Sequence, residues 1–554
     1  MKIISDITEI ESLKSSWEAL WQNDNWSTPF NHPDWILSYA KAFPYQNYFI
    51  IEMLKDQLAC VWPLQKVNQT FFFIGDPQAD YSHPSVSNDI SSEAAIQILL
   101  NGLDQLSFES LFLREWQQGD PLIAALHKYA RQCGYHTLIE KGFPCPRMVQ
   151  ESGSDIFYQK FVKSKNQKRV LNVLKRNGNL EFKTLSKESD IQKHLTSFFL
   201  MHTCRWETVG ETVFMDSAMR QFYTNLTQSL PQALIHFSLL KQEGNIIAMN
   251  YDFVHKKSLY WYKAAFNNQL NNQSPGLGLL CYIGREINEK GFQILDFTRG
   301  TETWKLRFAN DVAYTSNVFM TRKKRQVYQH QLKAAMHHIL SNLRKKEQIK
   351  NRIILLNRAV AKYGKFGLIS HILQKTRQRY FSNPEMVIME RCKTDMPPKP
   401  MKQLDTLHFI EGTYEHVFEI ADLLNPINKV HYVKDLIHRL DTGYHVFLGY
   451  IKKDLAYALW VTTEETKVYV EEINNELKLK PGAAYLIDGF TSPNYRGYGI
   501  HTLGLDYVAR QALNMENCTH VVGLALADNT PSIRGFEKSG YKYKGRIARH
   551  AVTY

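Results

Sequence analysis

At 554 residues the chain is too long for one hydrophobic core, so we expect about three or four domains. Its composition, 44% hydrophobic and 12% aromatic, excludes a disordered or fibrous chain and is typical of globular domains. The net charge of +13 comes from residues 321–380, which hold 16 Lys and Arg against one acidic residue, so the rest of the chain is close to neutral.

Signals for membrane insertion, export and disulfide bonding are all missing from the sequence. No stretch approaches the ~18 apolar residues of a membrane span, and MKIISDITEI at the N-terminus lacks the apolar region of a signal peptide. The seven cysteines are scattered and form no C-x-x-C pair, which is typical of reduced thiols and not of a zinc site. We therefore expect a cytoplasmic protein without a bound metal.

Residues 1–150 alternate helical and strand-like segments, as in an α/β domain. Strands are expected at 48–54, 58–63, 70–74 and 110–113, with helical spacing near Trp17 and Trp21 and again at 122–133. Residues 75–84 (GDPQADYSHP) predict a polar loop. Its Asp80, Tyr81 and His83 either line a pocket or form hydrogen bonds within the loop, and the sequence leaves both interpretations open.

Residues 151–320 predict a second α/β unit. Basic residues at 163–176 precede a strand at 180–185, and a helix at 191–207 carries His202, Arg205, Trp206 and Glu207. Strands follow around 233–240, 246–254 and 258–265, the last with Lys263. A helix is expected to begin at the turn 274–278, and a strand at 293–297 contains Asp296. The segment after this strand, TRGTETWKLRF at 298–308, contains Trp304 and Lys305.

Several segments of residues 10–320, in this order and spacing, resemble the CelD/BcsL-type acyltransferases of cellulose and exopolysaccharide synthesis, which are related to the FemAB aminoacyltransferases. They are PFNHPDW, ADYSHP, MHTCRWE, YWYKAAFN, SPGLGL and DFTRGTETWKLRF. The resemblance implies two GNAT-like halves and acyl transfer to an amine or hydroxyl of a small molecule or glycan precursor. It places His202, Arg205, Trp206, Lys263, Trp304 and Lys305 near the cleft between the halves.

Acyl transfer from a thioester needs a base for the acceptor proton and donors for the developing oxyanion. Glu207 or Asp296 is the candidate base, while Lys305, Lys263 and Arg205 are candidates to bind phosphate or polarise a carbonyl. Arg205 and Glu207 are two residues apart and face different sides of a helix, so they form no obvious pair. The alternative for each single charged residue is an ordinary solvated side chain.

Residues 321–400 predict a basic helical connector, in which apolar residues from Leu332 to Leu343 recur at helical spacing. Three interpretations remain open. The helices link the flanking domains, dock on an anionic membrane surface at the inner face, or bind nucleic acid such as tRNA. Charge alone gives no sequence readout, so specific DNA binding is not expected. MPPKP at 396–400 marks a boundary.

Residues 401–554 predict two helices, at 415–424 and 433–440, then strands at 446–451, 456–463 and 467–473. A further strand at 484–487 leads through Thr491 and a loop with Arg496, Gly497 and Gly499 into a helix. Glycines there let the backbone approach a ligand, and unpaired amides at the helix start can hold phosphate oxygens. Another strand at 519–526 precedes Asn529 and a short helix.

This C-terminal part resembles the GNAT superfamily of acyl-CoA-dependent N-acetyltransferases, through the six-residue pattern Q/R-x-x-G-x-G/A at 496–501 (RGYGIH) and the later Asn to Gly-Tyr segment at 529–541. The resemblance implies acyl-CoA as cofactor, bound by residues Phe490, Thr491, Arg496, Gly497, Tyr498, Gly499, Ile500, His501 and Asn529. Two departures matter: His501 puts a ring where it could crowd the phosphates, and Phe536 replaces the tyrosine that protonates the leaving thiolate.

Together these patterns predict an α/β (α+β) fold of tandem GNAT-like modules with mixed sheets flanked by helices. We expect domains at 1–150, 151–320, 321–400 and 401–554. The expected function is acyl-CoA-dependent acyl transfer in polysaccharide or cell-envelope metabolism. The alternatives are a CoA-binding regulatory or scaffold protein and a FemAB-like transferase that uses aminoacyl-tRNA.

Overall fold

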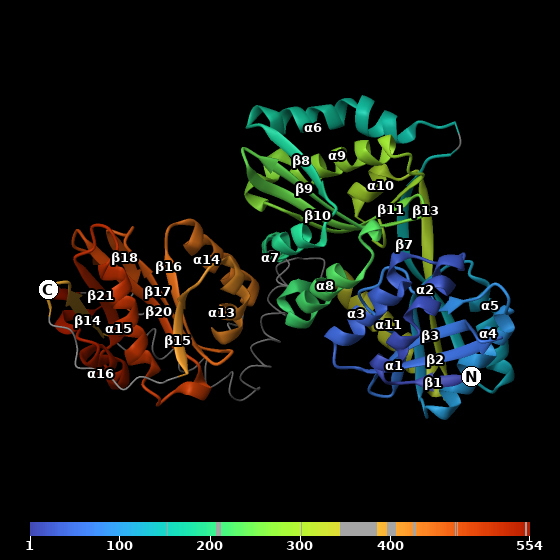
Figure 1. The fold of residues 1–554 in the computed structure, drawn as a ribbon, viewed down its shortest axis with the longest axis horizontal. Helices are drawn as coiled ribbons and strands as arrows, with labels where there is room; N and C mark the ends of the chain where they lie inside the picture. Colours follow the sequence, from blue (N-terminus) through green and yellow to red (C-terminus); the bar gives the residue numbers. More distant parts are fainter. Residues whose placement is uncertain are drawn as a thin grey trace. The chain divides into compact units, whose positions relative to one another are not determined.

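The structure, a computed structural model, describes residues 1–151, 153–206, 212–300, 302–343, 385–395, 406–424, 428–470, 473, 475–548 and 551–553. The chain divides into two compact units, of which unit 1 comprises residues 1–205 and 213–345 and unit 2 is the remainder. In each unit helices cover a mixed β-sheet (Figure 1), which confirms the expected fold class. None of the described helices has the length and hydropathy that a bilayer-crossing segment needs.

Unit 1 is built on one continuous 13-stranded sheet in the order β1-β2-β3-β4-β6-β13-β7-β12-β11-β10-β9-β8, with β5 beside β3. The long strands β7 and β13 join its two halves (Figure 1). The strands are β1 (Lys2–Ile4), β2 (Gln46–Leu54), β3 (Gln57–Val67), β4 (Thr70–Phe73), β5 (Ser85–Val86), β6 (Ser110–Gln117), β7 (His136–Val149), β8 (Leu180–Leu185), β9 (Ile235–Gln242), β10 (Asn245–His255), β11 (Ser258–Phe266), β12 (Ile294–Asp296) and β13 (Asp311–Thr321).

The helices of unit 1 pack on this sheet or on one another, as α4 does on β2 and α6 does on α9. Several begin with a side chain that caps the first turn, as Ser91 does for α4 and Asp120 for α5. The helices are α1 (Ile7–Ser12), α2 (Lys14–Asn23), α3 (Pro33–Ala42), α4 (Ser92–Gln105), α5 (Pro121–Gln132), α6 (Lys165–Arg176), α7 (Glu188–Arg205), α8 (Ser217–Ser229), α9 (Pro275–Glu289), α10 (Thr303–Phe308) and α11 (Lys324–Leu343).

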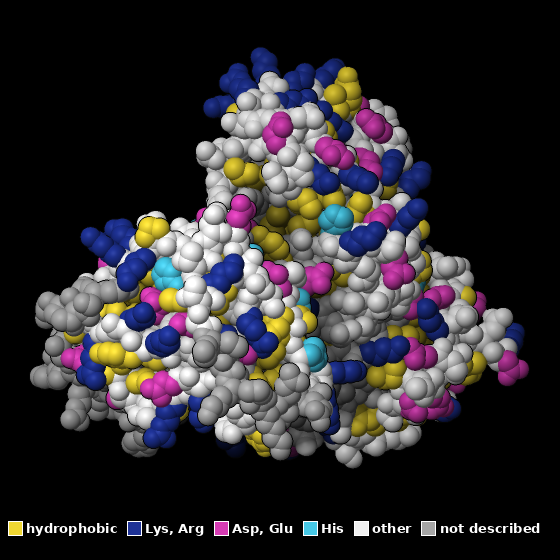
Figure 2. Space-filling view, turned by 60° about the vertical axis from the view of Figure 1, so that its left-hand side comes forward, with side chains coloured by type: hydrophobic (Ala, Val, Ile, Leu, Met, Phe, Trp, Pro, Cys, Tyr) yellow, Lys and Arg dark blue, Asp and Glu magenta, His cyan; other side chains and the backbone are white. Residues whose placement is uncertain are grey.

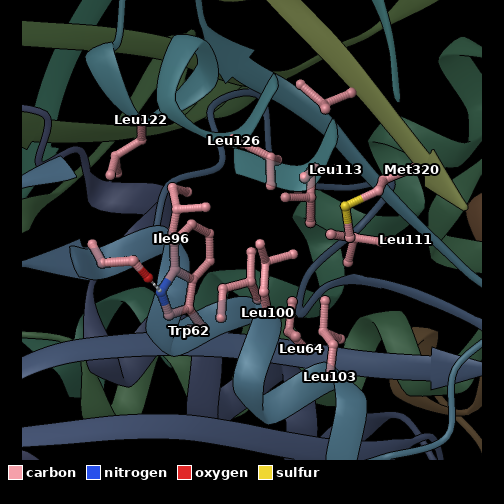
Figure 3. Packing of buried hydrophobic residues seen from close by; sticks show 14 of the residues in the cluster. Trp62, Leu64, Ile96, Leu100, Leu103, Leu111, Leu113, Leu122, Leu126 and Met320 are labelled. Atoms are coloured by element: carbon pink, nitrogen blue, oxygen red, sulfur yellow. Dashed lines mark hydrogen bonds between the residues drawn. The ribbon is translucent and has the colours of Figure 1, made fainter. Parts of the chain in front are cut away.

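The core of the first half lies between α4, α5 and the strands β3, β6 and β13 (Figure 3). Trp62 is fully buried there, and its indole nitrogen donates a hydrogen bond to the carbonyl of Ala95 on α4 at 3.2 Å. Leu100, Leu113 and Met320 belong to the same cluster and come from three different elements. Truncating such a tryptophan costs about 3–5 kcal/mol, so this core holds the first half of the sheet in place.

The second half contains the motif that positions the site, β11–α9–β12. The two strands are parallel and pair over only three residues each, Ser258–Tyr260 with Ile294–Asp296. Beyond Tyr260, β11 continues to Phe266 without this neighbour, so the strands diverge. Helix α9 packs closely on its neighbours through two glycines. A Cβ at Gly278 would lie 2.4 Å from Leu174 of α6, and a Cβ at Gly284 would lie 2.2 Å from Phe161.

Unit 2 has an eight-stranded sheet in the order β15-β16-β17-β20-β21-β14-β22-β23, and a separate hairpin of β18 and β19. Its strands are β14 (Glu385–Cys392), β15 (Leu407–Glu411), β16 (His445–Ile451), β17 (Asp454–Thr462), β18 (Lys467–Val470), β19 (Asn475–Lys478), β20 (Ala483–Thr491), β21 (His520–Leu526), β22 (Lys542–Ala548) and β23 (Ala551–Thr553). Its helices are α13 (Val417–Leu424), α14 (Lys429–Asp441), α15 (Ile500–Leu513) and α16 (Thr530–Lys538).

The motif β20–α15–β21 of unit 2 has the same design as β11–α9–β12. The parallel pairing joins Ala483–Tyr485 to His520–Val522, and β20 then runs on to Thr491. Residues 385–392, which we assigned to the helical connector, instead form β14 between β21 and β22. This strand is buried along most of its length, so its apolar residues form a run without the alternation that marks a half-exposed strand.

Candidate active site

A row of polar side chains crosses four adjacent strands of unit 1 where β11 and β12 diverge. Tyr260 of β11 is in register with Asp296 of β12, Asp296 with Arg147 of β7, and Arg147 with Asp311 of β13. Directly paired residues face the same side of a sheet, so the four side chains share one face. Arg147 donates to the Asp311 carboxylate, with Nε 3.0 Å from Oδ2.

Asp296 is the buried acid of this row, with only 4% of its surface exposed. Burial raises the pKa of its carboxyl to about 6, although hydrogen bonds from Thr298 and Tyr81 oppose the rise. The backbone N–H of Thr298 donates to Oδ1 at 2.7 Å, and the Tyr81 hydroxyl donates to Oδ2 at 2.8 Å. A held carboxylate with a pKa near neutrality suits a general base.

A cavity of about 380 Å³ opens in front of Asp296. Aromatic and polar side chains line it together, among them Trp26, Tyr81, Gln117, Arg147, Tyr260 and Asp296. Its size and mixed lining are those of a pocket for one small molecule or one end of a larger one. An acceptor amine or hydroxyl placed there would have Asp296 within reach.

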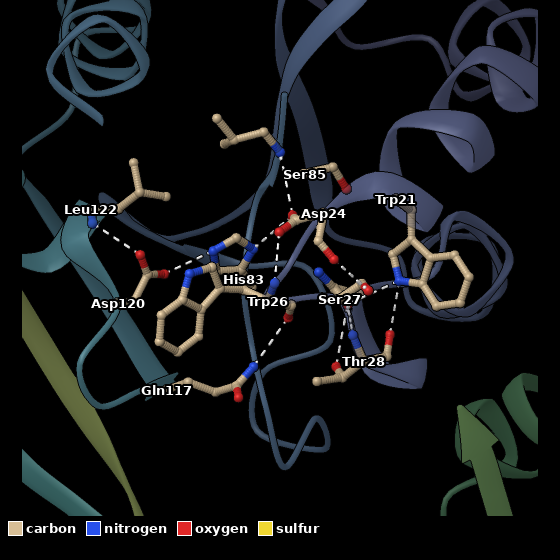
Figure 4. A network of polar contacts seen from close by, with 12 residues as sticks. Trp21, Asp24, Trp26, Ser27, Thr28, His83, Ser85, Gln117, Asp120 and Leu122 are labelled. Atoms are coloured by element: carbon tan, nitrogen blue, oxygen red, sulfur yellow. Dashed lines mark hydrogen bonds and ion pairs between the residues drawn. The ribbon is translucent and has the colours of Figure 1, made fainter. Parts of the chain in front are cut away.

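A buried ion network stiffens the wall of this cavity (Figure 4). His83 lies between two carboxylates, with Nδ1 3.3 Å from Asp24 and Nε2 2.8 Å from Asp120. Burial alone would lower the pKa of His83, but hydrogen bonds to Asp120 and Asp24 raise it to about 9. Asp24 also accepts from the backbone N–H of Trp26 at 2.8 Å, and Gln117 donates to the Trp26 carbonyl at 3.1 Å. The network therefore fixes two cavity-lining residues.

Of the three candidates in the predicted polar loop 75–84, one lines the cavity, and the other two pair with groups outside the loop and not within it. Tyr81 lines the cavity, whereas Asp80 and His83 are held in buried ion pairs. Asp80 accepts from Arg299, with Nε 2.7 Å from Oδ1, and Arg299 also donates to the Pro77 carbonyl at 2.6 Å. Arg299 is a residue that sequence reasoning missed, although it stands in the DFTRG segment.

Four of the predicted site residues form a basic cluster near the divergence. Burial and the charges of Lys263 and Arg205 hold the pKa of His202 well below its usual range, so this histidine is neutral. Burial lowers the pKa of Lys263 to about 8, and nearby Lys305 adds to this, while Asp80 opposes it. The Asp80 charge also raises the pKa of Asp296, so Asp80 acts on both Lys263 and the buried acid.

The other contacts of the site residues predicted at 151–320 are structural, and one of these residues lies outside the described chain. Arg205 donates to the Ala264 carbonyl at 2.6 Å and lies 4.5 Å from the Phe266 ring. Lys305 donates to the Arg299 carbonyl at 2.7 Å. Trp304 packs against Trp261 and Phe297, and Trp206 directly follows the end of α7. Glu207 lies outside the described residues, so Asp296 is the candidate base that the structure describes.

A second groove, of about 420 Å³, lies at the start of α9. Three cations line it, Lys160, Arg169 and Arg307, and its lining contains no Asp or Glu. Lys and Arg side chains also gather over neighbouring α6, at the top of Figure 2. The helix begins with Q-x-x-G-x-G at Gln273–Gly278, the pattern that we recognised at 496–501 and overlooked here. Such a groove suits phosphate groups.

The loop 496–499 of unit 2 presents its backbone to solvent. Gly497 and Gly499 have φ of 87° and 77°, a left-handed conformation that favours glycine, and a Cβ at either position would meet nothing within 4 Å. Within the described chain, no carbonyl or side chain accepts a hydrogen bond from the amides of residues 497–502. Tyr498 is 63% exposed. The loop is therefore open for an anionic ligand.

The other residues expected around this loop have roles of their own. Arg496 donates to the Thr491 carbonyl at 3.4 Å and lies over the Phe490 ring at 5.8 Å. Asn529 caps α16 by accepting from the Ser532 amide at 3.2 Å. These contacts order both ends of the divergence but leave the amides of the loop unoccupied.

The His501 ring does not crowd the loop, contrary to our concern. It points inward, with Nδ1 3.3 Å from the Tyr457 hydroxyl and its ring 6.2 Å from that of Phe536, and burial lowers its pKa to about 4. Phe536 is 4% exposed and packs so closely that a Cβ at Gly523 would lie 2.5 Å from it. Its ring brings no proton donor to the site.

One group of side chains in the described part of unit 1 has the spacing of cation ligands. Glu18, His32 and Asp34 lie close enough together to hold an ion. However, Lys14 contacts Asp34 Oδ1 at 2.5 Å, and His32 Nδ1 accepts from the Asp34 amide at 3.1 Å. These contacts engage one Asp34 oxygen and one His32 nitrogen, whereas Asp34 Oδ2 has no hydrogen-bond partner among the described residues.

Comparison with known proteins matches residues 163–306, about a quarter of the chain, to the family model described as an acetyltransferase (GNAT) domain. No curated protein matches the chain. Among solved structures, FemX is 10% identical over 59% of this chain and 99% of its own (TM-score 0.43). L-PGS from Bacillus licheniformis is 12% identical over 56% of this chain and 92% of its own, with a TM-score of 0.37. A GCN5-related N-acetyltransferase from Sphaerobacter thermophilus is 11% identical over 66% of this chain and 94% of its own, with a TM-score of 0.24. At these values their substrates do not carry over.

Proposed function

We propose that this chain, an acyltransferase with a GNAT-type domain at residues 163–306, takes its acyl group from CoA and transfers it to an amine or hydroxyl. We further propose a glycan or cell-envelope precursor as the acceptor and a cytoplasmic location. The observation that carries the proposal is Asp296, a buried carboxyl with a pKa of about 6, facing a cavity at the divergence of β11 and β12. The free cysteines support a reducing compartment.

Donor binding is supported by charge and by open backbone amides. In unit 1, Lys160, Arg169 and Arg307 would hold phosphate groups of CoA at the start of α9. In unit 2, the amides around Gly497 and Gly499 offer a second phosphate site. Both sets of donors fit a phosphate-bearing cofactor, because neither the groove lining nor the loop 496–499 contains a carboxylate.

The chemistry assigns one role to each part of the unit 1 site. Asp296 accepts the proton of the acceptor amine or hydroxyl as its nitrogen or oxygen bonds to the acyl carbon. Lys263, with Lys305 nearby, stabilises the negative charge that develops on the acyl oxygen. As the carbon–sulfur bond breaks, Asp296 returns the proton to the departing thiolate. Tyr81 and Thr298 hold the carboxylate in place throughout.

The test is release of free CoA, measured by thiol titration with acetyl-CoA and longer acyl-CoA donors against a panel of amines and amino sugars. The account predicts release that needs both an acceptor and Asp296. No release with any donor, together with no detectable CoA binding, would contradict it. Protection of tRNA without binding of CoA would favour an aminoacyl-tRNA donor instead.

A second candidate role concerns unit 2 alone. Because Phe536 is buried and has no hydroxyl, unit 2 would bind CoA as a regulatory or scaffold module without transferring the acyl group. The variant Phe536→Tyr separates the two possibilities. A gain in CoA release points to a transferase that lost its acid, whereas unchanged CoA affinity without turnover supports a binding module.

A further inference from the structure

Helix α11 (Lys324–Leu343) exposes a stripe of large apolar side chains. Tyr328, Leu332 and Met336 are 55%, 64% and 56% exposed, and they are four residues apart on consecutive turns. Residues at this spacing lie one above another along a helix. Scattered apolar residues at a surface are normal, but a row of three large ones on one helix marks a contact surface.

The opposite side of α11 is already attached to unit 1. The His330 ring stacks on Phe319 with centroids 4.4 Å apart, and its Nε2 lies 3.1 Å from the Glu140 carboxylate. Phe112 contacts the same imidazole edge-on at 4.7 Å. Because His330 fixes the rotation of the helix about its axis, the apolar stripe is held outward.

The exposed side of α11 is also positively charged. Lys324 precedes Tyr328 by four residues and so extends the stripe, while Arg325 and Lys333 lie in the adjacent row. No acidic residue occurs from 322 to 336. Arg322 and Lys323 pair with Asp104 of α4 and with Glu109, which precedes β6. Within the described chain no carboxylate pairs with Lys324, Arg325 or Lys333.

We propose that this α11 surface, formed by Lys324, Arg325, Tyr328, Leu332, Lys333 and Met336, docks on an anionic lipid membrane. Lipid is the occupant that uses every feature of the surface at once. The apolar side chains enter the acyl boundary, the tyrosine lies at the headgroup level, and the cations meet lipid phosphates. A nucleic acid would use the cations but leave Leu332 and Met336 in water. A protein partner of mixed surface charge would be matched by both basic and acidic side chains, whereas the α11 surface has basic residues and no acidic one.

The proposal is independent of the acyl-transfer chemistry and is tested by vesicle flotation with the full-length protein. Vesicles of phosphatidylcholine alone are compared with vesicles that also contain phosphatidylglycerol. The wild type should float only with the anionic vesicles, and high salt should release it because it screens the lysines. Leu332→Glu should lower the partition coefficient about 10-fold or more, since a leucine loses its burial. Combined Lys324→Gln, Arg325→Gln and Lys333→Gln should lower it on the order of 100-fold.

Two matched variants of unit 1 serve as controls. Leu54→Glu changes another exposed leucine, 43% accessible at the end of β2, and Lys165→Gln with Lys168→Gln and Lys175→Gln removes three exposed charges from α6. Both should bind as the wild type does. Equal binding to neutral vesicles, no binding to either kind, or equal losses in the control variants would overturn the proposal. RNA binding that the α11 triple variant abolishes, without any vesicle binding, would assign the surface to nucleic acid and overturn it as well.

Discussion

Replacing Asp296 by asparagine should abolish most activity without unfolding the protein. The two side chains have the same shape, and an amide oxygen can still accept the hydrogen bond from the Thr298 amide, which lies 2.7 Å from Oδ1. What is lost is the ability to take a proton. General bases contribute about 100- to 10,000-fold in rate, so Asp296→Asn should lower kcat by that factor.

The same substitution should leave stability unchanged or raise it. The pKa of Asp296 lies at about 6 in the folded protein against 3.8 in the unfolded chain, so the folded state binds this proton more tightly. Its contribution to stability is therefore most favourable at low pH and declines as the pH rises from 3.8 to about 6. At neutral pH the buried charge costs about 3 kcal/mol, which an asparagine would not incur.

The assay is initial-rate CoA release as a function of pH, with thermal unfolding of each variant measured alongside. For the wild type, kcat/KM should rise as pH increases through about 6, because only the ionised carboxylate of Asp296 can accept a proton. Asp311→Asn is the control, since Asp311 belongs to the same row but is 43% exposed and at the far end of it. The reasoning fails if Asp296→Asn keeps more than about a tenth of the activity, or if it loses activity only because it unfolds.

Three further predictions concern separate parts of the molecule. Because the pKa of Lys263 is lowered to about 8, the wild-type rate should fall above that pH, and Lys263→Arg, which stays charged, should move this fall to higher pH in the same assay. Gly499→Ala forces a residue with a Cβ into φ of 77° and should strain the loop by about 1–2 kcal/mol, which should weaken CoA binding in calorimetry. Gly443→Ala introduces the same kind of strain at φ of 81° outside the loop and should leave CoA binding unchanged. The pKa of His83 is about 9 in the folded protein against 6.5 in the unfolded chain, so its protonation stabilises the fold by about 3 kcal/mol. This contribution is complete below pH 6.5 and is lost as the pH rises through 9. Urea unfolding as a function of pH should detect the loss in the wild type and not in His83→Gln.

Local signals in the sequence were enough to predict the elements that carry the loop 496–499 and Asp296. The divergence of β20 from its neighbour, the open loop and the start of α15 follow from apolar runs, turn residues and two glycines that are close together in the chain. The Asp296 strand and the WK segment after it were identified in the same way. What the sequence could not supply was the neighbours of these elements.

The row that holds Asp296 could not be predicted, because its members come from strands that are distant in sequence. Arg147 lies near the end of β7, a strand that we did not predict, and its pairing with both Asp296 and Asp311 depends on strand order and register. Arg299 was missed for a related reason, since its partners belong to the first half of unit 1: Asp80 lies in the loop 75–84 and Glu115 on β6. The hydrophobic periodicity of a sequence does not indicate contacts between such distant segments.

The overlooked Q-x-x-G-x-G at Gln273–Gly278 shows that one pattern can serve two purposes. Gly276 and Gly278 do not have positive φ, and a Cβ on them would lie 2.7 Å from Phe266 and 2.4 Å from Leu174, so they permit close packing of α9. Gly497 and Gly499 instead have positive φ and open space around them. Only the structure separates glycines that pack a helix from glycines that expose a loop.

Calorimetric titration of acetyl-CoA into the full-length protein tests most directly whether this acyltransferase uses CoA. The account predicts saturable binding that weakens about 10-fold or more when Arg169→Gln and Arg307→Gln remove two cations from the groove at α9, and that weakens further with Gly499→Ala. Absence of any binding, or binding that neither change affects, would contradict it.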